Sequence, residues 1–245
     1  GTGGQPMEIA ADQLDFQLAN GNQLVSGDTV GPGKITIFPS PDSANKPHPA
    51  KNAKKAGSEG GGNATTVATA AHFHAVFGDN NRIRNLHGSP DSKIVSTSPG
   101  DPPKVSTAQN LDVAFAADGG AEKLVQSGDF RYHEPSAKPG TGGRAAFAEV
   151  ATYTPADHIL VLNGSPRVID GGMTTTAVVV RINRQTGEAI AEQDVKTTYS
   201  ELKAQPNGAL LASSDPIHVT SQRMTARNQP GVAHYTGNVR FWQEA

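Results

Sequence analysis

Apolar and polar residues alternate with a period of two near the end of the chain, in Gly231-Val-Ala-His-Tyr-Thr-Gly-Asn-Val-Arg-Phe-Trp-Gln243. The apolar positions are Ala233, Tyr235, Val239 and Phe241, and such a period is typical of a β-strand with one buried face. A glycine inside this pattern indicates a bulge or a close approach of two backbone segments. The rest of the chain contains earlier and less regular copies of the same unit.

Six copies of this unit follow one another, and each begins with a small residue: Ala11, Ala70, Ala108, Ala148, Ala177 and Ser221. Apolar or small residues follow three and five positions later, as Leu14/Phe16, Phe73/Ala75, Leu111/Val113, Ala151/Tyr153, Val180/Ile182 and Met224/Ala226. Each copy then reaches a glycine step, at Gly27, Gly88, Gly128, Gly164, Gln193 (where the glycine is missing) and Gly237. The step lies 16 residues after the small residue in four copies, 18 in the second and 20 in the third, which indicates an internal repeat.

Each copy predicts a β-hairpin, because two alternating stretches flank a turn rich in Gly, Asn, Asp or Pro. The expected turns are Asn20-Gly21, Gly78–Asn81, Asp118–Gly120, Thr154–Asp157, Gln185–Gly187 and Asn228–Gly231. A single hairpin cannot bury its apolar face, so the copies must stack on one another. Helical periodicity is absent. The predicted fold is therefore all-β, a twisted antiparallel β-jellyroll or sandwich of stacked hairpin repeats with almost no helix.

Two stretches interrupt the repeat. Residues 39–63 carry four prolines and four lysines, a composition that predicts a mobile loop and not a core. A shorter connection, Glu134–Gly143, separates the third and fourth copies. We expect one jellyroll domain over residues 1–245 with the insertion at 39–63; the alternative is two sub-domains, residues 1–135 and 144–245.

Composition indicates a globular protein without disulfides. Hydrophobic residues are 36% of 245, and 27 glycines bring the apolar share into the ordinary range. The absence of cysteine excludes disulfides and thiolate metal sites, and a net charge of −2 argues against a dedicated nucleic-acid-binding protein. No apolar run reaches the roughly 18 residues of a membrane span. The start Gly1-Thr-Gly-Gly4 is typical of a processed end. The abrupt end soon after Trp242 is typical of a fragment of a longer array.

The later copies resemble the repeat of the OstA/LptA-type lipopolysaccharide-transport proteins. The similar segments are Ile217-His-Val-Thr-Ser-Gln-Arg-Met224 with Ala233–Gln243, and Tyr153…Leu160-Val-Leu-Asn-Gly-Ser-Pro-Arg-Val168 with Gln193-Asp-Val-Lys-Thr-Thr-Tyr199. The resemblance is clear from Ala145 to Gln243 and looser before that, and its specificity comes from repetition. It implies a twisted β-jellyroll, open at both ends, that lies in the periplasm and carries lipopolysaccharide by its acyl chains between the two membranes.

The resemblance also implies partners. These are lipopolysaccharide or a similar lipid, other β-jellyroll transport proteins that join by their edge strands or head to tail, and an inner-membrane ATPase complex. The family includes a soluble bridge, a bitopic inner-membrane partner and the N-terminal part of an outer-membrane barrel, so a tether would lie in parts outside this sequence. Two departures from the pattern are the 39–63 insertion, which would block or gate the groove, and Gln193, which we expect to alter only a bulge.

The residues themselves allow an apolar gap between the expected sheets. Small inward residues (Ala75, Ala151, Ala226 and Ala233) leave room that a fatty acyl chain would fill. The candidates for lining the gap are the inward apolar residues of the six copies: Leu14, Phe16, Phe73, Leu111, Val113, Tyr153, Leu160, Leu162, Val180, Ile182, Met224, Tyr235, Val239 and Phe241. The alternative interpretation is plain core, in which aromatic residues pack against each other.

The ends of such an array and its basic residues have two interpretations each. The first copy (Met7–Val30) and the last (Ile217–Gln243) are either edges that pair with another chain or frayed ends.

Three residues past the glycine step, four copies carry a cation: Arg131, Arg167, Lys196 and Arg240. This regularity fits a basic row near lipid phosphates, or equally an ordinary exposed strand face.

No arrangement of residues predicts catalysis, a cofactor or a metal ion. His72, His74 and His87 form the best candidate cluster, but no carboxylate or cysteine has a companion spacing, so we expect a solvated strand face. Paired carboxylates, a nucleophile elbow and a phosphate loop are absent from the pattern. The lysine-rich run Lys46–Lys55 predicts a solvated linker; attraction of anionic head groups or nucleic acid is the alternative.

Three functional hypotheses follow. The first is a periplasmic carrier or bridge for lipopolysaccharide, which requires an apolar groove. The second is a structural β-sandwich spacer or interaction module with a filled core and no lipid. The third, an enzyme acting on a polysaccharide, requires paired carboxylates or a metal on one face, and the sequence offers neither.

Overall fold

The computed structural model describes residues 7–38, 64–136, 142–200, 215–228 and 231–243. These residues form eighteen antiparallel strands in one continuous sheet and one short 3-10 turn, Asp79–Asn81, which confirms the predicted fold class. The strands of the first three copies are β1 (Met7–Ala19), β2 (Gln23–Ile37), β3 (Thr65–Ala70), β4 (His72–Phe77), β5 (Ile83–Ser89), β6 (Ser92–Thr97), β7 (Lys104–Ala108), β8 (Asn110–Phe115) and β9 (Ala121–Glu134). Those of the last three are β10 (Arg144–Thr154), β11 (Ile159–Asn163), β12 (Arg167–Asp170), β13 (Met173–Thr176), β14 (Val179–Asn183), β15 (Ala189–Tyr199), β16 (Ile217–Asn228), β17 (Gly231–Thr236) and β18 (Arg240–Gln243).

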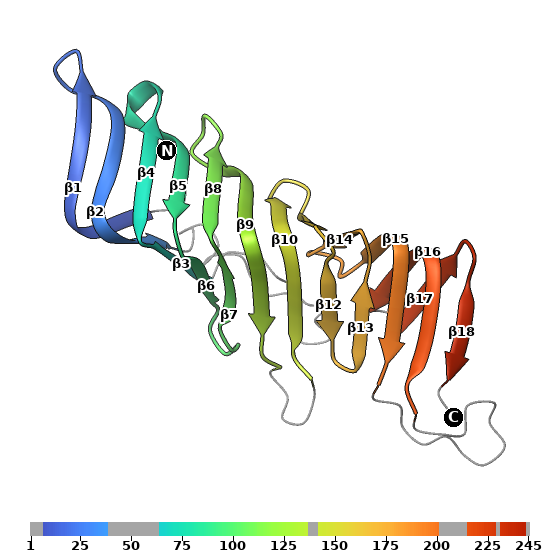
Figure 1. The fold of residues 1–245 in the computed structure, drawn as a ribbon. Coiled ribbons are helices and arrows are strands. Elements are labelled where there is room, and N and C mark those ends of the chain that lie inside the picture. The colour runs from blue at the N-terminus through green and yellow to red at the C-terminus, as the bar shows by residue number, and fades with distance from the viewer. Residues whose placement is uncertain (1–6, 39–63, 137–141, 201–214, 229–230, 244–245) are drawn as a thin grey trace, which may run out of the picture.

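The sheet folds over into two layers, and the strands follow one another along the molecule from β1 to β18 (Figure 1). The first layer has the order β1-β2-β4-β5-β8-β9-β10-β11-β14-β15-β16-β17. The second has the order β1-β2-β3-β6-β7-β9-β10-β12-β13-β15-β16-β18. Six long strands belong to both layers, so every copy contributes to both walls of the space between them.

The chain changes layer at corners built from residues in the left-handed region. In four copies two consecutive residues there have positive φ: Gly128/Asp129, Gly164/Ser165, Gln193/Asp194 and Gly237/Asn238. The facing strand hydrogen-bonds to the corner carbonyl, as the Gln109 and Gln222 N–H groups do to Gly128 and Gly237 at 2.8 Å each. Gln193 adopts φ 65° without being glycine, so the corner persists where the repeat lacks its glycine.

In the first two copies the corner does not lie at the glycine step of the repeat. Gly27 and Gly88 are not left-handed; the left-handed residues are Gly31 (φ 81°) in the first copy and Asp91 (φ 59°), after Pro90, in the second. The corner, at Gly31 and Pro90, therefore lies 20 residues after the small residue in the first three copies and 16 after it in the last three. The first three hairpins are longer than the last three.

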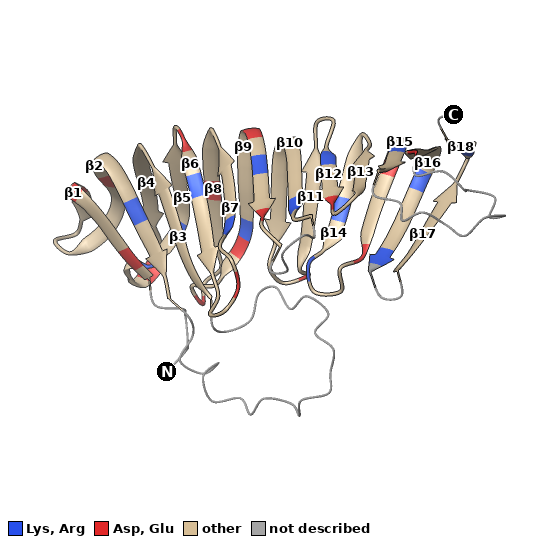
Figure 2. Ribbon diagram, turned by 90° about the horizontal axis from the view of Figure 1, so that it is seen from below, with Lys and Arg blue, Asp and Glu red and all other residues tan. Residues whose placement is uncertain are grey.

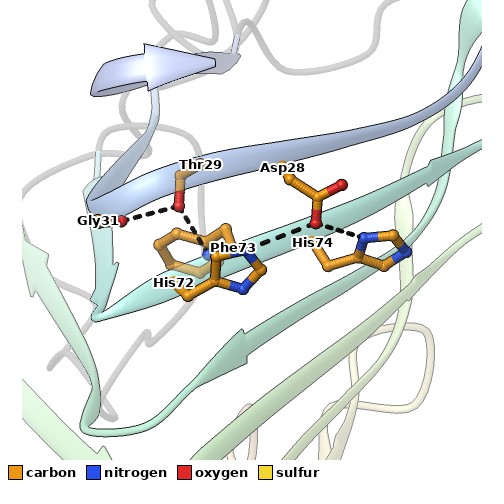
Figure 3. A network of polar contacts seen from close by, with 6 residues as sticks. All are labelled: Asp28, Thr29, Gly31, His72, Phe73 and His74. Atoms are coloured by element: carbon orange, nitrogen blue, oxygen red, sulfur yellow. Dashed lines mark hydrogen bonds and ion pairs between the residues drawn. The ribbon is translucent and has the colours of Figure 1, made fainter. Parts of the chain in front are cut away.

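Close packing explains the glycine at position 88. A Cβ there would lie 2.5 Å from the ring of Phe73, and a Cβ at Gly33 would lie 2.7 Å from the same ring. The buried Thr29 hydroxyl donates to the Gly31 carbonyl (3.0 Å) and accepts the Phe73 N–H (2.9 Å), as Figure 3 shows. Gly88 thus makes room for a buried ring, and Thr29 fixes the first corner.

The small residue that begins each copy lies beside the corner, where the two layers converge. Five of the six are buried: Ala70, Ala108, Ala148, Ala177 and Ser221. Two core clusters fill the angle between the layers. One contains Ile35, Phe73 and Leu111 from the first half of the chain; the other contains Leu162, Val180 and Met224 from the second half.

Five of the six predicted hairpin turns lie where the sequence placed them, between the strands that flank residues 20–22, 78–82, 116–120, 155–158 and 184–188. Three predicted features lie wholly or partly outside the described residues: the sixth turn (229–230), the insertion 39–63, and residues 137–141 of the second connection. β9 and β10 pair with each other in both layers across that connection. The division of the chain into one domain or two stays a prediction.

Replacement of Gly164 by alanine tests the corner. Gly164 has φ 82°, and its added Cβ would collide with the Glu149 side chain, so we expect the free energy of unfolding to fall by about 2–4 kcal/mol. Gly171→Ala is the control, since φ is 56° there but no atom lies within 4 Å; it should cost only about 1–2 kcal/mol. Urea denaturation measures both, and equal losses would contradict the role of the corner.

Candidate functional site

A cavity of about 470 Å³ lies between the two layers, along the first three copies and the start of the fourth. Its first-layer wall includes Leu86, Leu111, Val113, Leu124, Ala151 and Tyr153. Its second-layer wall includes Ile35, Ile37, Ala68, Ile94, Phe130 and Tyr132. Both walls are mainly apolar, so the cavity suits an apolar guest of the size of a small ligand.

Hairpin length and small side chains together account for this space. The longer hairpins of the first three copies carry the layers farther from the corner, and small residues such as Ala68 and Ala121 line the gap without reaching across it. In the second half the hairpins are shorter, and Leu162 and Met224 are at most 2% exposed within a packed cluster. The cavity therefore belongs to the part of the array with the longer hairpins.

Polar side chains form a small network at the cavity wall. The Tyr132 hydroxyl donates to Glu134 Oε2 (2.9 Å), and Lys104 Nζ lies 3.5 Å from Glu134 Oε1. The Arg184 guanidinium lies over the Tyr132 ring, 5.4 Å from its centroid. Burial lowers the pKa of Arg184 to about 10, so the group still carries its charge at neutral pH, and burial raises the pKa of Tyr132. Lys104 and Arg184 thus bring two cations to an otherwise apolar cavity.

A buried amide also faces this cavity. The Ser106 hydroxyl donates to Gln126 Oε1 (2.7 Å), while Gln126 Nε2 has no hydrogen-bond partner within the described part of the chain. A buried donor without an acceptor costs roughly 1–3 kcal/mol.

The structure distributes the fourteen predicted lining residues over three environments. Four line the cavity and also belong to the core clusters or pack against them: Leu111, Val113, Tyr153 and Leu160. Six belong to the core clusters or pack against them: Phe73, Leu162, Val180, Ile182, Met224 and Tyr235. Four are between 36% and 53% exposed, on the end strands or at the last corner: Leu14, Phe16, Val239 and Phe241. These four are not enclosed between the layers.

Sequence reasoning missed the second-layer wall. The residues three and five positions after the small residue all fall in the first layer, so candidates chosen by that rule omit Ile35, Ile94 and Phe130. The alternation in the strand after each corner was the available signal. In the first two copies the unrecognised corner obscured it.

The histidines lie on the outer face of the first layer and form ion pairs with aspartates. His74 Nδ1 lies 2.8 Å and His72 Nε2 3.5 Å from Asp28 Oδ1 (Figure 3), and His87 Nδ1 lies 2.7 Å from Asp112. In the part of the chain that the structure describes, no group of three His, Asp, Glu or Cys residues is placed to hold a metal ion. Asp28, His74, His87 and Asp112 thus lie side by side on four neighbouring strands of the outer face.

Comparisons with known proteins add little. No protein-family model matches the sequence, and no curated protein sequence matches it. Among solved structures the chain is similar to LptH, described as the LptA-homologous periplasmic component of the lipopolysaccharide transport device from Pseudomonas aeruginosa, with 13% identity over 77% of this chain and 83% of that one. The TM-score is 0.35, and so low a value supports no conclusion about function. No helix among the described residues is long and apolar enough to cross a membrane.

A matched pair of substitutions tests whether the cavity is open. Ala151 and Ala191 both belong to the core cluster of the second half, on the inner face of the first layer, but only Ala151 also lines the cavity. We expect Ala151→Leu to change the free energy of unfolding by less than about 1 kcal/mol, because the added carbons enter the cavity, and Ala191→Leu to lower it by about 1–3 kcal/mol through overpacking. Urea denaturation of both variants decides the point. Similar losses at the two positions would mean that the space beside Ala151 is packed as tightly as the space around Ala191.

Proposed function

We propose that the chain is a carrier that shields lipid acyl chains between its two β-layers. The observation that carries the proposal is the apolar cavity of about 470 Å³, a volume within the range of ordinary ligand pockets. The resemblance of the repeat to OstA/LptA-type proteins supports lipopolysaccharide as the lipid and the periplasm, on the route to the outer membrane, as the location. We propose no catalytic role.

The energetics of acyl burial fit a passive carrier. Transfer of each methylene from water to an apolar site contributes about 0.8 kcal/mol, so a chain of a dozen carbons gains about 10 kcal/mol relative to water. Relative to a bilayer the gain is near zero, because lipid tails are as apolar as the cavity. The carrier thus shields the lipid without driving its transfer. Direction comes from a partner, for which the resemblance suggests an inner-membrane ATPase complex.

The polar groups of the cavity favour an amphiphile with an anionic group. A phosphate or carboxylate beside Arg184 and Lys104 would form charge-assisted hydrogen bonds. Lipid A-type molecules have such an anionic group, and a plain hydrocarbon does not.

The two ends of the array support partners of the same architecture. Among the described strands, β1 pairs only with β2 at one end, and β17 and β18 pair only with β16 at the other. Inner-face side chains remain exposed at both ends, with Phe16 at 48% and Phe241 at 53%. We propose that these edges pair with other β-jellyroll transport proteins or with a second copy, head to tail.

One observation favours the alternative of a spacer without lipid. The second half of the array is filled, since Leu162, Val180 and Met224 are at most 2% exposed in one packed cluster. If the cavity of the first half collapses in solution, the whole chain is an ordinary sandwich.

Photo-crosslinking to lipopolysaccharide tests the carrier. A photoreactive residue at position 124 replaces a leucine that faces the cavity, and one at the adjacent position 123 replaces a lysine on the outer face of the same strand. We expect crosslinks from position 124 at least about tenfold above those from position 123, because the acyl chains lie between the layers. Ala151→Trp should abolish the crosslinks from 124 by filling the cavity.

Equal crosslinking at 123 and 124, or none at 124 in a folded protein, would contradict the carrier and leave the spacer. Circular dichroism of each variant establishes that it is folded. Insensitivity to Ala151→Trp would show that lipid reaches position 124 without entering the cavity.

Charged substitutions at the ends test the pairing of edges. Phe16→Lys and Phe241→Lys should each weaken self-association or binding to a jellyroll partner by about tenfold, because each places a charge in the contact. Val178→Lys is the control, an exposed apolar residue (41%) in the middle of the array that should have no effect. Sedimentation velocity over a range of concentrations measures the association. An equal effect of all three variants would show that general hydrophobicity, and not the edges, drives it.

A further inference from the structure

A row of cations crosses the outer face of the second layer. The chain of cross-strand pairs runs Ala10, Lys34, Thr69, Lys93, Thr107, Arg131, Phe147, Arg167, Thr176, Lys196, Thr220 and Arg240. Directly paired residues lie on the same face of a sheet, so these side chains form one line. Figure 2 shows the corresponding blue bands on alternate strands from the β2 end to the β18 end.

Each copy supplies one cation of this cationic row, three residues after its corner. The sequence revealed Arg131, Arg167, Lys196 and Arg240. The corners found at Gly31 and Pro90 add Lys34 and Lys93 at the same offset. All six side chains are exposed, and no acidic residue lies within the row. The repeat therefore places a positive charge on every second strand of this layer.

The spacing of the charges is set by the sheet. Neighbouring strands lie about 4.8 Å apart, so successive cations lie roughly 9.5 Å apart, and the row from Lys34 to Arg240 spans about 48 Å. Threonine stands between the cations at four of the five positions; at the fifth, the Arg167 guanidinium lies 4.4 Å from the centre of the Phe147 ring. The row offers regularly spaced charges with hydroxyl groups between them.

The side chains on either side of the row favour a single extended chain, and not a flat surface, as its ligand. On the corner side of the row, three of the cations follow an aspartate by two residues: Asp91, Asp129 and Asp194. Asp129 forms an ion pair with Arg131, in which Oδ2 lies 2.7 Å from Nη2. Away from the corner, the adjoining row of side chains has one carboxylate, Glu8 on β1, and otherwise no Asp, Glu, Lys or Arg, with Val67, Val95 and Ile169 among its members. An anionic bilayer pressed on this face would meet all of these carboxylates, whereas a single chain laid along the row avoids most of them and competes with Asp129 for Arg131.

We propose that the cationic row binds an extended acidic polysaccharide with an anionic group on every second sugar. A spacing of roughly 9.5 Å is close to the length of an extended disaccharide, and the threonine hydroxyls suit sugar hydroxyls. Single-stranded nucleic acid has more closely spaced phosphates and is bound with aromatic stacking, for which this row has only Phe147. The inference is independent of the carrier function, because the row and the cavity lie on opposite faces of the second layer.

Hyaluronan oligosaccharides, which have one carboxylate on every second sugar, are the probe. Fluorescence anisotropy at low ionic strength measures binding to the full chain. The row variant combines Lys93→Gln, Arg131→Gln, Arg167→Gln and Lys196→Gln. The control variant removes the same charge from the outer face of the first layer and its adjoining turns, with Arg84→Gln, Lys123→Gln, Arg181→Gln and Arg223→Gln.

We expect the row variant to bind at least about tenfold more weakly and the control variant to stay within about twofold of the parent. Affinity should rise from four sugars to ten, as more cations are engaged, and fall with added salt. Similar losses in both variants, no rise with chain length, or tighter row-dependent binding of anionic vesicles or single-stranded DNA would each overturn the proposal. Circular dichroism and binding of neutral dextran provide the controls for folding and for charge.

Discussion

The two-layer architecture depends on a backbone constraint at the corner of each copy, where the last four copies have two consecutive left-handed residues and the first two have one. A strand continues straight unless some residues leave the β region, and L-residues enter the left-handed region only at a cost of roughly 1–2 kcal/mol. Glycine avoids most of this cost at Gly128, Gly164 and Gly237, whereas Gln193 accepts it. Backbone hydrogen bonds join a corner to the segment that begins the same copy, as from Gln109 to Gly128 and from Gln222 to Gly237. The small residue beside the corner, buried in five of the six copies, lets the layers converge.

The length of chain between the small residue and the corner sets how deep the space between the layers is. This spacing is twenty residues in the first three copies and sixteen in the last three, so the space between the layers differs between the two halves of the array. The first half holds a cavity with Leu111 and Leu124 in its wall, and the second half a packed cluster around Leu162. The same corner fixes the outer face, because the residue three positions later always points away from the cavity. One periodic constraint thus produces both an apolar interior and a regular line of external charge.

Much of this was predictable from the sequence. Period-two alternation, small residues and turn signals gave the fold class, five of the described hairpin turns and the inner face of the first layer. What the sequence could not separate was two physical roles of glycine. Gly128 and Gly164 permit positive φ, whereas Gly88 makes room for the ring of Phe73. In the sequence, glycines of these two kinds look the same. That ambiguity left the corners of the first two copies unrecognised, hid Lys34 and Lys93 from the basic row, and left the second-layer wall of the cavity out of the predicted site.

In the proposed carrier, an acyl chain held in the cavity touches side chains of the first three copies and the start of the fourth, and not the packed residues beyond. Nuclear Overhauser effects from a protonated lipid to the leucine and valine methyl groups of an otherwise deuterated protein measure this contact directly. The expected result is a set of cross-peaks to Leu111, Val113 and Leu124, with none to Leu162 or Val180. Cross-peaks to Leu162 and Val180, or cross-peaks confined to exposed residues such as Leu14, would contradict a carrier that binds lipid in the cavity.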